Sequence, residues 1–149
     1  MSWYELSWPA QALRALIVYG WYLSRNAGPV ASGAFENAEG TKLLGWELLL
    51  FIIVTIVAGI IVQAFFAIMA VTSGQETTEL LGEDERDKRI EARAMVRGFT
   101  MTGLGFGGMV LALWQGWGAI WAINVMLCGM VLNDVTVNLY KFFRYWRGE

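Results

Sequence analysis

Two stretches without a charged residue, 48–75 and 98–133, constrain the fold of this chain more than any other feature. Each is long enough to cross the roughly 30 Å hydrocarbon core of a bilayer, which takes about 20 helical residues. A soluble domain usually has about a quarter of its residues charged, whereas 16% are charged here. The sequence therefore predicts an integral membrane protein that is all-α, because a helix satisfies its own backbone in lipid.

Four membrane-spanning helices are expected, and their approximate ranges are 9–24, 43–72, 97–114 and 118–140. The last two belong to one apolar stretch, which the sequence QGWG at 115–118 divides into a helical hairpin. The first segment is short for a bilayer and contains Arg14, so a helix lying in the membrane interface is the alternative. We predict that residues 1–149 form a single membrane domain, a four-helix bundle.

The segments between the spans differ in composition. Residues 25–42 are rich in Gly, Ala and polar residues and contain Pro29, which predicts an exposed loop. Residues 73–96 are expected to form a polar hinge followed by a charged connector helix, in which acids precede bases as the helix dipole favours. The tail, 141–149, mixes bases with aromatic residues and is expected to be an anchor at the membrane surface.

The distribution of Lys and Arg predicts the orientation of the chain. Five lie in 73–97 and three in the tail, against two in 25–42 and none in the turn at 115–118. The positive-inside rule then places the connector and both termini in the cytoplasm.

Several classes of function are disfavoured by composition. The chain has no histidine and one cysteine, Cys128, which we expect to be buried and which cannot form an intramolecular disulfide. A net charge of −2 provides no basic field for direct binding of nucleic acid. Neither a nucleophile–base pattern nor a phosphate loop is present. We therefore expect a non-enzymatic protein without a cofactor or a resident metal.

Ionisable residues within membrane spans are the first functional candidates. Arg14 and Asp134 both lie ~8–10 Å from the cytoplasmic ends of their helices, and Gln63 lies ~13 Å deep, at 1.5 Å per residue. We hypothesise a polar layer in which Arg14 pairs with Asp134 near Gln63, as a packing device rather than a transport site. In the alternative, Arg14 extends to lipid headgroups and Asp134 contacts water. Glu47 is expected to extend to the membrane interface.

The connector helix supplies the second set of candidates, as contacts for a partner or for lipid: Asp84, Glu85, Arg86, Asp87, Arg89, Arg93 and Arg97. A solvated helix laced with salt bridges is one interpretation. An arginine stripe against anionic lipid, a divalent cation on the acids of 83–87 and a docking site for a cytoplasmic protein are the others. In the third span, Gly103 and Gly107 have GxxxG spacing, which predicts a tight packing face within the chain; a dimer interface, and hence a homo-oligomer, is the alternative.

The connector also carries a resemblance, on the pattern DERD..IE.RA..RG that runs from Asp84 to Gly98. It resembles the motif of a family of small bacterial inner-membrane proteins of unknown function, in which the motif precedes a closing two-helix hairpin and a basic end. The similarity is best over 83–148, although the glycine-rich GLGFGG in the third span departs from the pattern. The resemblance implies a bacterial plasma membrane and four helices. It also implies a regulatory partner, because some members are encoded beside small helix-turn-helix transcriptional regulators.

Two functions follow from these observations. The leading one is a non-enzymatic inner-membrane protein that binds or restrains a cytoplasmic or membrane partner through the connector helix. The alternative is a small oligomeric transporter or proton-coupled carrier that uses Asp134 or Glu47.

Overall fold

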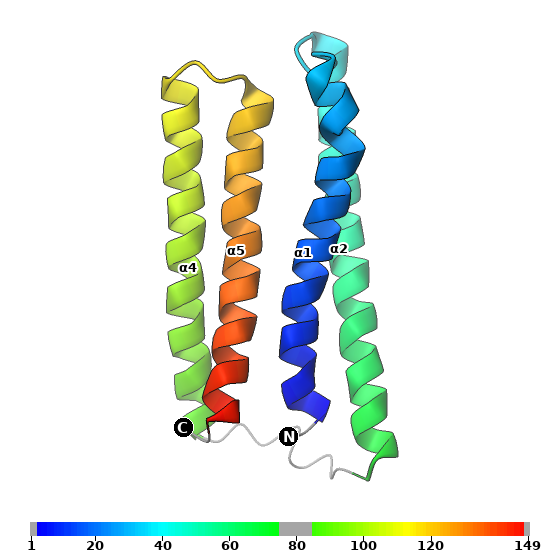
Figure 1. Cartoon of the computed structure of the whole chain (residues 1–149), viewed down its shortest axis with the longest axis vertical. Helices are drawn as coiled ribbons and strands as arrows, with labels where there is room; N and C mark the ends of the chain where they lie inside the picture. The colour runs from blue at the N-terminus through cyan, green and yellow to red at the C-terminus, as the bar shows by residue number, and fades with distance from the viewer. Residues whose placement is uncertain (1–2, 75–84, 148–149) are drawn as a thin grey trace.

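The computed structural model describes residues 3–74 and 85–147 of the chain. Its helices are α1 (Trp3–Ala31), α2 (Ala38–Thr72), α4 (Glu85–Trp114) and α5 (Ala119–Trp146). They lie along one common axis, with the start of α1 and the end of α5 at the same end of the molecule (Figure 1). The predicted all-α architecture is confirmed.

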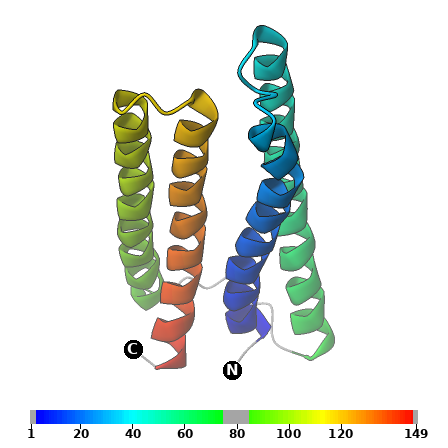
Figure 2. The ribbon, with the colours of Figure 1, turned by 45° about the horizontal axis from the view of Figure 1, so that its top comes forward.

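The four helices form two hairpins. The most extensive contacts join α4 to α5, followed by those of α1 with α5 and of α1 with α2. The two hairpins therefore meet through α1 and α5, with α2 and α4 on the outside (Figure 2). This arrangement is compatible with the predicted four-helix bundle.

Three of the described helices, α2, α4 and α5, are long and apolar enough to cross a membrane; α1 is not among them. Large apolar side chains cover the outside of the molecule, including Ile60 of α2 and Phe99 of α4. A contiguous apolar exterior of this kind is typical of a surface that meets lipid. Membrane crossing by α1 stays a prediction.

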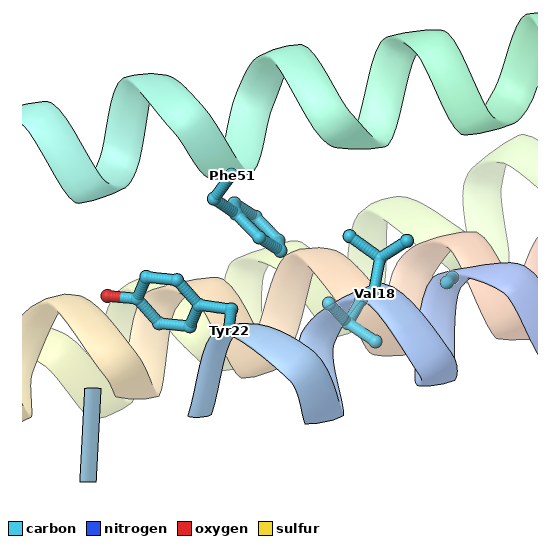
Figure 3. Close-up of a cluster of buried hydrophobic side chains, with 5 residues drawn as sticks. Val18, Tyr22 and Phe51 are labelled. Atoms are coloured by element: carbon cyan, nitrogen blue, oxygen red, sulfur yellow. The ribbon is translucent and has the colours of Figure 1, made fainter. Parts of the chain in front are cut away.

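The largest apolar cluster joins α1, α2 and α5. Figure 3 shows the Phe51 ring of α2 directed toward Val18 and Tyr22 of α1, and Val131 of α5 belongs to the same cluster. Cys128 of α5, expected to be buried, is exposed, because it lines an apolar cavity of ≈ 500 Å³ between α1 and α5.

Glycines in the left-handed region end α1 and α4. Gly33 has φ 68°, and the Ala34 N–H beside it donates to the Pro29 carbonyl at 2.9 Å. Gly116 has φ 79°, and the Trp117 N–H donates to the Ala112 carbonyl at 2.9 Å, as the Ala34 N–H does to the Pro29 carbonyl. Both are Schellman motifs, in which glycine takes a conformation that other residues adopt only with strain.

The predicted exposed loop at 25–42 is wrong in extent, since only 32–37 lie between α1 and α2. Pro29 removes one backbone donor, but the helix continues through it and ends two residues later, at Ala31. At the other side, Asn37 caps α2 by accepting a 2.7 Å hydrogen bond from the Gly40 N–H. A β-carbon at Gly40 would lie 1.9 Å from the Ala34 carbonyl oxygen, so glycine is needed for the turn to fold onto this helix start.

The charged connector is continuous with the apolar helix that follows it, because α4 runs from Glu85 to Trp114 without a break. Asp84 and most of the predicted hinge lie outside the described residues. The predicted surface anchor at 141–149 begins as a direct continuation of α5, which extends to Trp146.

Glycines also set the distance between α4 and α5, although they are not the predicted pair. A β-carbon at Gly105 would lie 2.7 Å from the Gly129 Cα atom, so the two backbones touch at this point. By contrast, a β-carbon at Gly103 or Gly107 would meet nothing within 4 Å. The prediction of a packing face within the chain at Gly103 and Gly107 is wrong, because those residues point away from α5.

Candidate functional site

Arg14 and Asp134 form an ion pair between α1 and α5. The Arg14 Nη2 atom lies 2.7 Å from the Asp134 Oδ2 atom and donates a hydrogen bond to it. The Arg14 side chain is 12% exposed, whereas that of Asp134 is 43% exposed. The guanidinium is therefore the enclosed partner, and the carboxylate is the more exposed one.

The same guanidinium also contacts the backbone of α2. Its Nη1 atom donates to the Thr55 carbonyl at 2.6 Å, and Gln11, one turn earlier in α1, donates to the Gly59 carbonyl at 3.2 Å. A β-carbon at Gly59 would lie 2.9 Å from the Arg14 Nη1 atom. Glycine at this position thus lets Arg14 lie against α2, and one cation links three helices.

A cavity of ≈ 590 Å³ surrounds this pair. Gln63, the third member of the hypothesised layer, lines it together with Arg14 and Asp134 but is exposed. Lys141 and Glu91 line the same cavity and form a 2.8 Å ion pair with each other. The three residues of the proposed layer therefore line one cavity, which extends to Glu91 near the start of α4 and to Lys141 near the end of α5.

A second ion pair joins α1 to α2 near the turn between them. Arg25 donates from Nε and Nη2 to the two carboxylate oxygens of Glu47, at 2.7 and 3.1 Å. The Glu47 side chain is 10% exposed and that of Arg25 is 46% exposed. Glu47 is thus paired with a residue of α1 within the chain, and its position at the membrane interface stays a prediction.

The charged part of α4 packs against the end of α5. The Lys141 ammonium donates to Glu91, and the Tyr145 hydroxyl donates to Asp87. Arg86 lies over the Tyr145 ring, 5.6 Å from its centroid. We call this set of contacts, between 85–97 of α4 and 140–146 of α5, the helix-end clasp.

The charges of the clasp separate by sign. Asp87, Glu91 and Arg86 are partly buried against α5, whereas the other cations of α4 are exposed: Lys88, Arg89, Arg93 and Arg97. Glu85 is exposed as well, at the first residue of α4. Pairing of two acids with α5 leaves a predominantly cationic outer face on this part of α4.

The described residues do not provide the usual groups for metal chemistry. No three His, Cys, Asp or Glu residues within 3–74 and 85–147 are placed to hold a metal ion. Glu83 and Asp84, two of the acids considered as ligands in the connector, lie outside these ranges. What the described side chains offer is paired charge inside the helix assembly and unbalanced positive charge at one end of it.

Comparison with known proteins adds no functional assignment, since no family model, curated protein or solved structure matches the chain.

Proposed function

We propose that this chain is a non-enzymatic, multi-pass protein of a bacterial inner membrane, and that it binds or restrains a protein partner through the connector part of α4. The termini and the helix-end clasp face the cytoplasm in this proposal, as the positive-inside rule expects. The resemblance of the connector to a family of small inner-membrane proteins points in the same direction. It also makes a transcriptional regulator a candidate partner.

The observation that carries the proposal is the sign separation in the clasp. If 85–97 served only to join two spans, its acids and bases could neutralise one another along the helix. Instead, Asp87 and Glu91 contact α5, and Lys88, Arg89 and Arg93 stay exposed. A cationic helix face held rigidly at a membrane surface is suited to an acidic segment of a partner, which it would attract electrostatically.

A photo-crosslinking residue at Ala92, which is exposed on the connector, tests this function in living cells. We expect a discrete protein adduct with the otherwise native chain, reduced at least tenfold when Lys88→Glu and Arg89→Glu are combined. The matched control is Lys42→Glu, which reverses an exposed cation near the start of α2, at the opposite end of the molecule. An adduct that persists after reversal at Lys88 and Arg89 would contradict the proposal, as would cells that yield only lipid adducts.

The orientation has its own test. With Cys128→Ser as the background, single cysteines replace Lys88 and Lys42, both of which are exposed. A membrane-impermeant thiol reagent should label Lys42→Cys in intact spheroplasts and Lys88→Cys only after permeabilisation. The reverse pattern would place the clasp outside the cell and remove the proposed partner site.

A small oligomeric transporter or proton-coupled carrier remains the second candidate, favoured by the polar cavity around Arg14 and Asp134. Asp134 and Glu47 are each bound by an arginine, so either would have to break an ion pair to carry a proton. Reconstitution into liposomes tests this function. Solute-driven proton flux that is lost in Asp134→Asn would support it, and no flux above that of empty liposomes would exclude it.

A further inference from the structure

A cavity of ≈ 540 Å³ lies where the first part of α4 meets the last turns of α5, apart from the cavity around Arg14. Its lining consists of four arginines and two aromatic residues: Arg93, Arg97, Arg144, Arg147, Tyr140 and Phe143. Arginine stays protonated in proteins, so four positive charges surround one space.

Both helices contribute cations to this cavity, and an aromatic ring lies between them. The Arg97 guanidinium lies 4.1 Å from the Tyr140 ring centroid, and that of Arg144 lies 5.8 Å from the same centroid. Each contact is within the range of a cation–π interaction, which favours keeping the guanidinium over the ring. Tyr140 thereby helps to hold an arginine of α4 and an arginine of α5 toward one site.

Three of these four cations have no carboxylate partner among the described residues. Within 3–74 and 85–147, no ion pair joins Arg93, Arg97 or Arg147 to a carboxylate. The acids of the connector that approach α5, Asp87 and Glu91, contact Tyr145 and Lys141 instead. Like charges that share a cavity repel one another, and a bound anion would remove that repulsion.

We propose that this cavity binds a phosphate group, presented by the headgroup of an anionic phospholipid. Guanidinium groups bind phosphate oxygens in pairs and with charge assistance, which suits a site made of several arginines. The lipid source is favoured by Phe143, an aromatic residue that lines the cavity and is 46% exposed. An acyl chain would pack against this ring while the headgroup stays among the arginines.

The inference rests on the membrane location proposed above but is independent of a protein partner. Its test is lipid binding by the purified, delipidated full-length protein in detergent, measured by native mass spectrometry. The three probes are phosphatidylglycerol, phosphatidylcholine and inorganic phosphate. We expect one saturable phosphatidylglycerol per chain, bound at least tenfold more tightly than phosphatidylcholine or free phosphate.

Two double variants test the cavity from its two helices. Arg144→Gln with Arg147→Gln, and Arg93→Gln with Arg97→Gln, should each weaken phosphatidylglycerol binding at least tenfold. Arg89→Gln is the matched control, because Arg89 is an exposed arginine of α4 that does not line the cavity, and it should bind as the native chain does. Circular dichroism establishes that each variant retains its helices.

Native affinity in both folded double variants would overturn the site, as would equal affinity for phosphatidylcholine. Free phosphate that binds as tightly as phosphatidylglycerol would overturn the lipid assignment. These outcomes are distinct from failure of the proposed function, because crosslinking at Ala92 reports on the protein partner alone. Membrane location is tested separately, by whether the chain leaves cell membranes only when detergent is added.

Discussion

Along the contact of α4 with α5 the backbones touch, whereas α1 and α2 are joined by apolar side chains and by long polar ones. At Gly105 and Gly129 there is no room for a β-carbon. Between α1 and α2, Arg14 contacts the Thr55 carbonyl and Arg25 binds Glu47. Close packing of small residues and interhelical hydrogen bonds are the two general ways to join helices when lipid removes the hydrophobic driving force. Touching glycine backbones are found between α4 and α5, and side chain–backbone hydrogen bonds from Gln11 and Arg14 join α1 to α2.

The largest expected effect comes from separating the touching backbones. Gly105→Leu would push α4 away from α5, and overpacking of this kind costs about 3 kcal/mol of the free energy of unfolding. Gly103→Leu is the control, because a β-carbon at this exposed position would meet nothing within 4 Å, and a surface change costs within about 0.5 kcal/mol. Reversible unfolding in mixed micelles measures both. Equal effects of the two variants would mean that α4 faces α5 by another side.

The next effect concerns the pair that joins three helices. Arg14→Ala and Asp134→Ala should each lower the free energy of unfolding by about 2 kcal/mol, less than for a fully buried pair because Asp134 is 43% exposed. The double variant should cost about 1 kcal/mol less than the sum of the two, since each single change already breaks the shared contact. The same unfolding measurement gives all three values. Strict additivity would show that the two side chains do not interact.

A smaller effect is expected at the second pair, with an asymmetry that follows from burial. Arg25→Gln leaves the enclosed Glu47 carboxylate without its partner and should lower the free energy of unfolding more than Glu47→Gln does. Glu47→Gln leaves only the half-exposed Arg25 uncompensated and should cost less than about 1 kcal/mol. The unfolding free energies of the two variants, measured under the same conditions, test this order. The opposite order would indicate that Glu47 lies in a solvated position.

The smallest effect is at the turn between α1 and α2. Asn37→Ala removes the acceptor for the Gly40 N–H and should cost about 1 kcal/mol, as is usual for the loss of a helix N-cap. Asn37→Ser keeps an oxygen at this position and should remain within about 0.5 kcal/mol of the native chain. If both variants unfold like the native chain, the cap contributes nothing to the stability of this hairpin.

Residue types and spacing were sufficient to predict four helices, and counting depth from the helix ends placed Arg14 and Asp134 at matching levels. The contact of Arg25 with Glu47 was missed because the composition of 25–42 suggested a loop. In the structure α1 continues past Pro29 to Ala31, and the left-handed residue that follows its end is Gly33. The cap at Asn37 was a readable signal for the start of α2.

The glycines of α4 show what spacing alone could not provide. Gly103 and Gly107 have the recognised interval, yet Gly105 is the residue that faces Gly129 of α5. Spacing identifies residues that share one side of a helix, but the direction of that side depends on the partner helix. Likewise, the cavity of the four arginines arises only when α4 and α5 lie side by side, so neither helix indicates it by itself.

The order of contacts along the chain has a consequence for biogenesis. Each hairpin consists of helices that are neighbours in the sequence, α1 with α2 and α4 with α5, so it can form as soon as it has been synthesised. By contrast, α1 can contact α5 only when synthesis is nearly complete. Until then, Arg14 has no Asp134 to bind. Before α5 is complete, the Arg14 guanidinium can bind only the Thr55 carbonyl of α2, so its carboxylate partner is the last of its contacts to arrive.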